Sequence, residues 1–307
     1  MILLNKFFRW YRGHKVNFLM IVFATIIGVL LIKAYIKNER ETTNSNDVKE
    51  YNLYNESTIK STKSAITYED VESGILETAN RVIDKFITLL NENNYVEAYN
   101  LLSKDCKSEL YPSIDDFKIN YYDEIFKTYK SYTMQNWLKN TYKIGYRESL
   151  LDTGGVKEES FIRDYITVVR ENNEYKLNIN NFIGVNIINK KVENQGLEIE
   201  IVSKSIYMNY EIYKISVKNN LSQKIKLCNL QELASIYILD NNNIRYYACL
   251  NELTEAEIQI PSKVKTNFNI KFMNTYTDGK SIQKIVFQNI LLQGEQKNNI
   301  KVICDII

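Results

Sequence analysis

The sequence predicts a membrane-anchored protein with two folded domains, an α+β domain followed by an all-β sandwich. Three observations lead to this prediction. An unbroken apolar stretch occupies residues 16–36. Helical periodicity begins near residue 69 and gives way to strand patterns before residue 185. From residue 186 to residue 307 the chain shows only strand-like alternation between turn signals.

The predicted boundaries follow from these changes in pattern. They are a cytoplasmic basic segment at 1–15, a transmembrane helix at 16–36, a polar tether at 37–68, the α+β domain at 69–185 and the β-sandwich at 186–307.

The apolar stretch has only Asn17 and Thr25 as polar residues before Lys33. At about 1.5 Å per residue it would reach roughly 31 Å as a helix, enough to cross a bilayer core. No small-residue cleavage site follows, so a signal-anchor is expected instead of a cleaved signal peptide. The basic residues from Lys6 to Lys15 favour a cytoplasmic N-terminus. The sequence therefore predicts a single-pass cell-membrane protein with extracytoplasmic domains, and the lipid bilayer as the partner of residues 16–36.

Charge and histidine content exclude several classes of function. The 39 basic and 37 acidic residues are spread evenly, so no basic stripe points to nucleic acid. The single histidine, His14, precedes the apolar stretch, which leaves the later chain without His-dependent catalysis or His-ligated metals. The four cysteines form no C-x-x-C pair, so neither zinc nor another cofactor is predicted. Cys228 and Cys249 either pair or are buried thiols, and the second interpretation is favoured.

Helices are predicted first. An apolar stripe recurs from Val71 to Leu90 and stops at the polar cluster 91–94. A second, short helix carries residues 95–102. Ser113 is then a favourable N-cap, with Asp115 and Asp116 in the first turn of a third helix.

Strands follow the helices. Residues 132–146 and 161–170 are rich in aromatic and β-branched side chains, with a Gly154-Gly155 turn between them. Residues 175–179 alternate apolar and polar after the turn at 171–174. Helices followed by a short antiparallel sheet indicate an α+β domain.

The first domain resembles a known family. A long helix followed by Asn94-Tyr95-Val-Glu-Ala98-Tyr99-Asn-Leu101-Leu102-Ser103 is similar to the start of nuclear-transport-factor-2-like domains. The resemblance covers about 70–185 and implies helices packed into a cone-shaped, curved antiparallel sheet. Some relatives are ketosteroid-isomerase-like enzymes with an acid or base in the cone. Others are non-catalytic modules of conjugation and secretion proteins that follow a single membrane span.

The second domain shows about seven short strands with turn signals between them, which indicates a β-sandwich. The segment 212–220, the hairpin at 240–243 and Pro261-Ser262 resemble telokin-like, immunoglobulin-fold domains. Such domains are common in exported proteins of Gram-positive bacteria and usually carry no catalytic site. The richness in Asn, Lys, Ile and Tyr is typical of an AT-rich genome, such as that of a low-GC Gram-positive bacterium.

Few residues suggest a catalytic or binding role. Asp115 and Asp116 are adjacent on one helix and point about 100° apart, so they start a helix and do not form an acid/base pair. Asp240 with three asparagines lacks the Gly and Glu of a calcium loop and fits a hairpin turn. No catalytic, cofactor-binding or metal-binding residue is predicted. Three aromatic residues are instead the candidate ligand or partner surface: Trp137, Tyr142 and Tyr165.

Two hypotheses of function remain. The first is a non-enzymatic cell-envelope protein that acts through contacts with an envelope partner or a second copy, as a conjugation/secretion-type or accessory component. The second is a small-molecule or peptide binder, or a ketosteroid-isomerase-like enzyme, that uses the cone pocket. A buried carboxylate with a raised pKa would favour the second hypothesis. A filled cone with an exposed sheet would favour the first.

The last strand, residues 299–307, is unusually apolar for a chain terminus. It is either central and covered on both faces or an interface.

Overall fold

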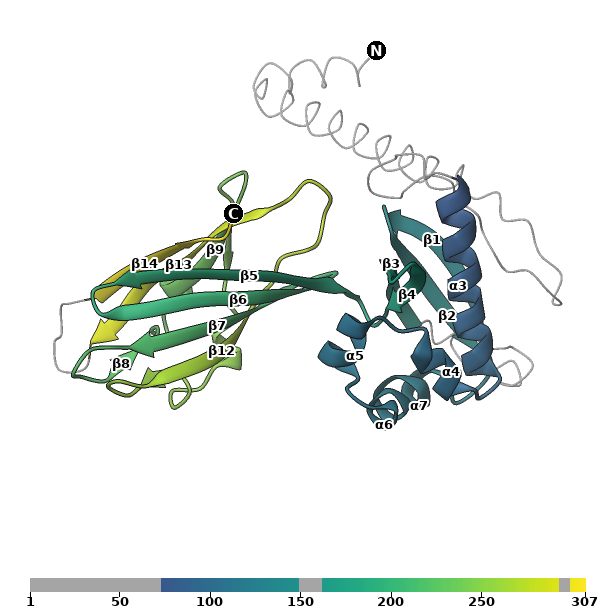
Figure 1. Ribbon diagram of the computed structural model, residues 1–307, viewed down its shortest axis with the longest axis horizontal. Coiled ribbons are helices and arrows are strands. Elements are labelled where there is room, and N and C mark those ends of the chain that lie inside the picture. Colours follow the sequence, from purple (N-terminus) through teal and green to yellow (C-terminus); the bar gives the residue numbers. More distant parts are fainter. Residues whose placement is uncertain (1–72, 149–161, 293–298) are drawn as a thin grey trace, which may run out of the picture. The chain divides into compact units, whose positions relative to one another are not determined.

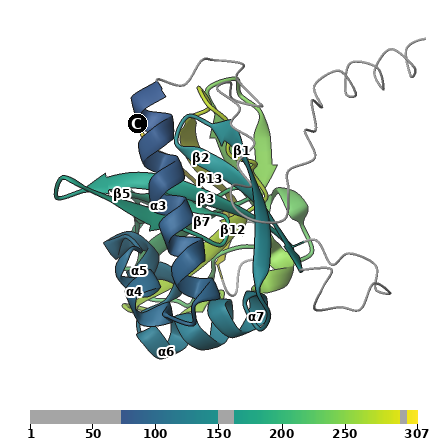
Figure 2. The same cartoon turned by 90° about the vertical axis from the view of Figure 1, so that its right-hand side faces the viewer.

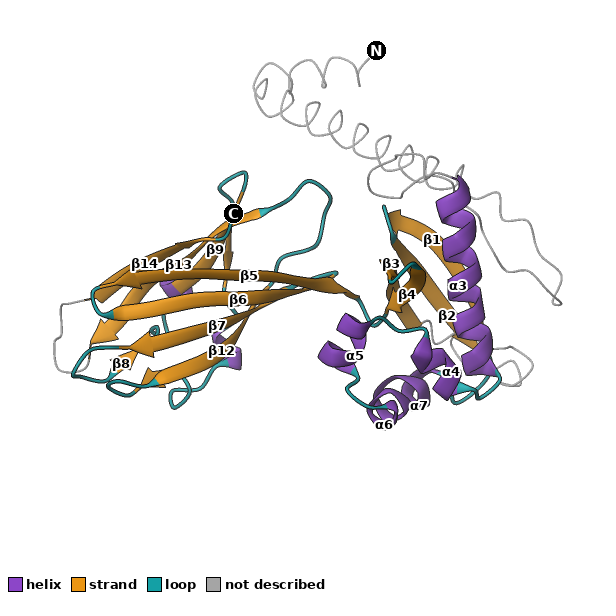
Figure 3. Ribbon diagram, viewed as in Figure 1, coloured by secondary structure: helices purple, strands orange, loops and turns teal. Residues whose placement is uncertain are grey.

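The computed structural model describes residues 73–148, 162–292 and 299–307. Among these residues strands account for 50% and helices for 22%, so the described part of the protein is mostly β. The α-helices, which are purple in Figure 3, all precede the first described strand along the chain.

The longest described helix is α3 (Ser73–Asn91), and it is amphipathic. Its buried residues recur at helical spacing: Ala79, Ile83, Phe86, Ile87 and Leu90. Asn91 ends the helix and ties it to the first strand. Its side chain donates to the Lys130 carbonyl and accepts from the Lys130 amide, both at 2.9 Å. The predicted stop at 91–94 is confirmed.

Short helices follow α3. They are α4 (Tyr95–Asn100), α5 (Lys104–Leu110), α6 (Ile114–Phe117), the π-helix η1 (Lys118–Tyr122) and α7 (Asp123–Ile125). Ser113 and Asp116 form a capping box at α6, with the Ser113 hydroxyl 3.1 Å from the Asp116 amide. The prediction that Asp115 and Asp116 open a helix is therefore confirmed.

The first sheet is an antiparallel meander in the order β1-β2-β3-β4. Its strands are β1 (Lys130–Leu138), β2 (Thr141–Glu148), β3 (Ile162–Glu171) and β4 (Glu174–Asn178). Figures 1 and 2 show α3 running along one face of this sheet. The Tyr132 hydroxyl of β1 donates to Asp84 of α3 at 2.7 Å, which fixes the helix on the sheet.

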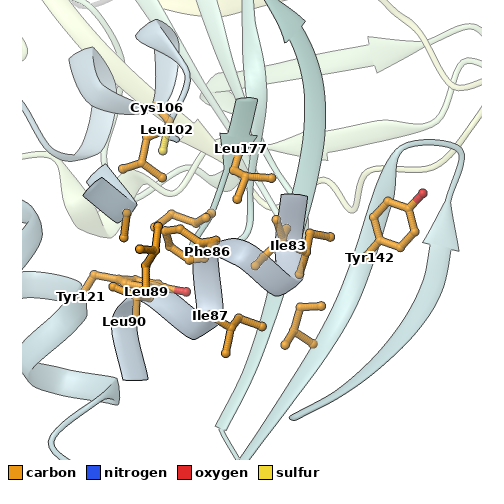
Figure 4. Packing of buried hydrophobic residues seen from close by; sticks show 14 of the residues in the cluster. Ile83, Phe86, Ile87, Leu89, Leu90, Leu102, Cys106, Tyr121, Tyr142 and Leu177 are labelled. Carbon is orange, nitrogen blue, oxygen red and sulfur yellow. The ribbon is translucent and has the colours of Figure 1, made fainter. Parts of the chain in front are cut away.

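An aromatic core fills the space between the helices and this face, which we call the inner face of the sheet. Its buried aromatic residues are Phe86, Tyr111, Phe117, Tyr121, Tyr122, Phe126, Tyr132, Tyr142, Tyr146, Phe182 and Tyr207. Figure 4 shows Phe86 close to Tyr121, with Tyr142 farther out on its strand. The ring centres of Phe86 and Tyr121 are 6.2 Å apart.

Two further sheets are built from the rest of the described chain. One has the order β12-β7-β6-β5, with β5 (Phe182–Asn194), β6 (Leu197–Tyr207), β7 (Glu211–Asn219) and β12 (Lys265–Phe272). The other has the order β10-β9-β13-β8-β11, with β14 beside β13. Its members are β8 (Ile225–Lys226), β9 (Ile236–Asp240), β10 (Arg245–Tyr247), β11 (Gln259–Ile260), β13 (Ile282–Leu292) and β14 (Asn299–Asp305). The 3-10 turns η2 (Leu233–Ser235) and η3 (Leu250–Glu252) connect strands of this sheet.

An aliphatic core lies between these two sheets. Its side chains come from both of them and include Ile199, Ile201, Ile215, Ile238, Ile270, Ile285, Val302 and Cys304. Inward residues alternate with outward ones along each strand, as period-2 geometry requires.

The final strand is an edge strand of its sheet. Among the described residues β14 pairs with β13 alone, and its inward side chains are buried while Ile303 is 44% exposed. The Asn194 side chain of β5 donates to the Lys301 carbonyl at 2.9 Å. The strand is therefore not central and covered on both faces.

The predicted fold class is wrong. No helix among the described residues is long and apolar enough to cross a membrane, and the predicted span at 16–36 lies outside those residues. Within α3, Arg81 and Lys85 are exposed opposite the apolar stripe, so that stripe packs on a sheet and does not face lipid. The predictions of a transmembrane signal-anchor, a single-pass cell-membrane localisation and a cytoplasmic N-terminus are corrected with it.

The predicted balance of elements is also corrected. A membrane-anchored cone of helices on a sheet followed by an immunoglobulin-like sandwich does not fit a protein that is half strand. The helices after α3 span only three to seven residues, whereas β5, β6 and β13 span eleven to thirteen. Apolar spacing marked where helices begin, but it could not show how soon they end.

Candidate functional site

The first candidate site is an aromatic pair on the outer face of the β1–β4 sheet, the face opposite α3. Trp137 of β1 and Tyr165 of β3 meet edge to face, with ring centres 5.5 Å apart and planes inclined by 61°. Lys143 of β2 lies opposite Tyr165 in the ladder, and its Nζ is 4.8 Å from the centre of the Trp137 ring. All three side chains are partly exposed. We call these three residues the outer cluster.

Tyr142, the third aromatic residue of the predicted surface, lies on the other face of the sheet. It is adjacent to Lys143 in a strand, so the two side chains point in opposite directions. Tyr142 is fully buried in the aromatic core, and burial raises the pKa of its hydroxyl. The structure therefore brings Trp137 and Tyr165 together and separates Tyr142 from them.

The outer face near this cluster is basic. Pairing places Arg147 and Arg163 on the same face as Lys143, and both arginines are exposed. The described outward positions of β1, β2 and the first half of β3 include no acidic residue. Sequence reasoning missed the arginines, although the spacing Lys143-x-Gly145-x-Arg147 places all three residues on one face of a strand.

The second candidate is a carboxylate inside the aromatic core that the sequence reasoning also missed. Asp164 of β3 is only 2% exposed. Its Oδ2 accepts from the Tyr121 hydroxyl at 2.8 Å and from the Asn180 amide at 3.1 Å, and its Oδ1 accepts from the Asn181 amide at 3.0 Å. The Tyr121 and Tyr146 hydroxyl oxygens are 3.2 Å apart. The sequence signal that could have revealed Asp164 is an acidic residue at an inward position of an otherwise apolar strand.

The surroundings of Asp164 explain why it is there. Asn180 and Asn181, which connect β4 to β5, both have positive φ, at 58° and 63°. Their partly buried backbone amides would lose their acceptor if Asp164 were absent. The π-helix η1 places Tyr121 over the same carboxylate. Asp164 thus joins the helices to the β4–β5 turn.

The pKa of Asp164 would suit acid/base chemistry, but a substrate cannot reach the carboxylate. Burial raises the pKa of Asp164, and the hydrogen bonds from Tyr121, Asn180 and Asn181 oppose that rise. A raised carboxyl pKa is a frequent mark of a catalytic base. A base must also reach a substrate proton, and this carboxylate is enclosed with donors on both oxygens. We interpret it as structural.

Other predicted features have plain roles. All four cysteines are free, so Cys228 and Cys249 do not pair. The Asp240 Oδ1 atom accepts from the Asn242 and Ile244 amides, both at 2.9 Å, which is the predicted hairpin turn. Within the described residues no group of three or more His, Cys, Asp or Glu side chains could hold a metal ion.

Comparisons with known proteins identify no family. No protein-family model matches the chain, and no curated protein matches it. Among solved structures, the crystal structure of the yjhA protein from Bacillus subtilis is 12% identical, and the match covers 38% of this chain and 96% of that chain. The TM-score of 0.28 is too low to carry an argument. The resemblances to nuclear-transport-factor-2-like and telokin-like domains stay predictions.

Proposed function

We propose that the protein is a non-enzymatic binding protein that holds a protein partner against the outer face of the β1–β4 sheet. The outer cluster carries this proposal. Trp137 and Tyr165 are large, rigid side chains that are partly exposed on a sheet face, and Lys143 fixes the position of the indole. Tryptophan, tyrosine and arginine are the residues most enriched where partners bind tightly.

The interior of the same region supports a non-enzymatic role. The helices and the inner face enclose a packed aromatic core, and Asp164, its buried carboxylate, is saturated by hydrogen bonds. A filled interior beneath an exposed sheet face favours contact over catalysis. The predicted ketosteroid-isomerase-like alternative requires a carboxylate that a substrate can reach, and Asp164 does not meet that requirement.

The charge of the face defines the partner. Lys143 lies beside the aromatic pair, so the surface that complements it there is acidic. Such complementarity speeds association and makes binding depend on salt.

Site-specific photo-crosslinking tests this function. A benzophenone analogue of phenylalanine replaces Tyr165 in the full chain, in the cells that naturally contain it. We expect one discrete adduct of higher mass. The matched control replaces Tyr247, an exposed tyrosine of β10, and should give none. Equal adduct patterns at both positions, or an adduct of the chain with itself, would contradict an acidic protein partner.

Charge reversal then tests the chemistry. Lys143→Glu should reduce the adduct yield by about fivefold or more, because a repulsive charge replaces an attractive one. Lys214→Glu, at an exposed position of β7, should leave the yield unchanged.

A further inference from the structure

We propose that a hollow between α4, α5 and the β3–β4 turn binds a small anionic molecule with an apolar portion, such as an aryl phosphate or aryl carboxylate. This inference does not rest on the proposed function, because the hollow shares no residue with the outer cluster. It is a depression open to solvent with a volume of about 700 Å³, within the usual range of ligand sites.

Three lysines surround the hollow. Lys104 and Lys107 come from α5 and Lys176 from β4, whereas Glu171 is the only acidic residue among those that line it. The lining therefore carries two more positive than negative charges. Glu171 is already engaged, because its Oε2 accepts from the Lys104 amide at 3.1 Å.

The apolar part of the lining is equally definite. Tyr99 of α4 and Pro112 form the accessible apolar lining, and Leu102, which also lines the hollow, is only 1% exposed. The Lys107 Nζ lies 4.6 Å from the centre of the Tyr99 ring. An anion bound by Lys107 would therefore lie beside the Tyr99 ring, and an apolar group attached to that anion would lie next to Tyr99 and Pro112.

The lysines are held on elements that are fixed to each other. The Ser103 amide donates to the Leu177 carbonyl at 3.0 Å, and the Leu177 amide donates to the Leu101 carbonyl at 2.9 Å. The Ser103 hydroxyl also caps α5 by accepting from the Cys106 amide at 3.0 Å. Lys176 is oriented by the Asn100 carbonyl at 3.1 Å and by Glu174 at 2.9 Å. The site is thus largely formed before a ligand arrives.

Burial and neighbouring charge both act on Lys107. Burial and then the charge of Lys176 lower the pKa of Lys107. Lys176 is already paired with Glu174, whereas Lys107 has the Tyr99 ring beside it, so an anion at Lys107 would add a new charge pairing. Such an arrangement favours an anion beside Lys107.

Calorimetric titration of the full chain tests the proposal with phenyl phosphate, inorganic phosphate and uncharged benzyl alcohol. We expect saturable binding of phenyl phosphate, at least about fivefold tighter than inorganic phosphate, and none of benzyl alcohol. Lys107→Gln should weaken phenyl phosphate binding by about tenfold, the worth of one charge-assisted contact.

Two matched variants make the result decisive. Glu171→Gln keeps an acceptor for the Lys104 amide but removes the negative charge, so it should tighten binding by about two- to fivefold. Lys214→Gln on β7 should change nothing. Absence of saturable phenyl phosphate binding, equal effects of Lys107→Gln and Lys214→Gln, or binding of an acidic peptide in place of phenyl phosphate would overturn the assignment.

Discussion

The aromatic core and the aliphatic core are stabilised in different ways. The aromatic core buries seven tyrosines, at positions 111, 121, 122, 132, 142, 146 and 207, whereas the aliphatic core buries one, Tyr213. Each buried hydroxyl requires a partner or bears a desolvation cost. In the aliphatic core the partner is close in sequence, since the Tyr213 hydroxyl donates to Glu211, two residues away, at 2.8 Å.

In the aromatic core the partners come from distant parts of the chain. The network of Tyr121, Tyr146, Asp164 and the Asn180–Asn181 amides links a π-helix, two strands and a turn. The comparison teaches that a buried acid can be a structural consequence of a tyrosine-rich interior and need not mark a catalytic site.

The largest expected effect is the removal of Asp164. Asp164→Ala removes the acceptor of the buried Tyr121 hydroxyl and of two partly buried backbone amides, so we expect a loss of about 3–5 kcal/mol of unfolding free energy. Urea unfolding followed by Trp137 fluorescence measures it, with Trp10→Phe leaving a single tryptophan in the chain. The control Asp84→Ala removes an exposed acceptor of Tyr132 and should cost about 1 kcal/mol. A loss below 1 kcal/mol for Asp164→Ala would show that the network is dispensable.

The aliphatic core should respond to volume instead. Ile238→Ala at a fully buried position should cost about 3 kcal/mol, through lost burial and a cavity. Ile244→Ala in the same hairpin, where the side chain is 52% exposed, should stay within about 0.5 kcal/mol. Urea unfolding followed by far-UV circular dichroism compares the two variants. Equal effects at both positions would contradict this account of the core.

Alkaline pH should destabilise the aromatic core. Burial raises the pKa of Tyr121 and of Tyr146 well above the ordinary value of about 10. A folded-state pKa above the unfolded value gives stability that is complete below about pH 10 and is lost as pH rises further. Each such tyrosine should remove up to about 1.4 kcal/mol per pH unit above that point.

The Trp137 unfolding curve at pH 8, 10 and 11 measures this loss. Tyr146→Phe should flatten the pH dependence, because it removes one of the two buried hydroxyls that ionise. Among the hydrogen bonds described, the Tyr146 hydroxyl contacts only that of Tyr121, so the substitution leaves the bonds of Asp164 in place. A slope unchanged by Tyr146→Phe would exclude this tyrosine as a source.

The smallest expected effect concerns the thiols. Burial raises the pKa of Cys106, Cys228 and Cys304 to about 12, whereas Cys249 is only partly buried. Iodoacetamide at pH 8 should therefore label Cys249 first in the folded protein, and all four cysteines in urea. Mass spectrometry locates the label. Labelling of Cys106 before Cys249 would mean that the aromatic core opens more readily than its packing implies.

Much of the local structure could be predicted from the sequence. The apolar stripe from Val71 to Leu90 predicted α3, and the polar cluster at 91–94 predicted where that helix ends. Ser113 was correctly predicted as the N-cap of α6. These features depend on neighbours in sequence, where spacing and capping chemistry act directly.

What failed depends on contacts between distant residues. Strand alternation assigns each residue to one of the two faces of its strand. The bulge between Asn136 and Leu138 shifts the register of β1 against β2, so spacing alone could not place Trp137 beside Tyr165. Asp164 is a single acid whose partners lie at Tyr121 and in the 180–181 turn. The apolar length of 16–36 is a necessary condition for a membrane span and not a sufficient one, and the membrane-anchored fold class inferred from it is corrected above.

The claim that this protein works through its outer face and not through Asp164 is tested most directly by one crosslinking measurement. The adduct yield from position 165 is compared between Lys143→Glu and Asp164→Asn chains, at a temperature where circular dichroism shows both to be folded. We predict that Lys143→Glu lowers the yield by about fivefold or more and that Asp164→Asn leaves it unchanged. A yield that falls with Asp164→Asn and persists with Lys143→Glu would contradict the account.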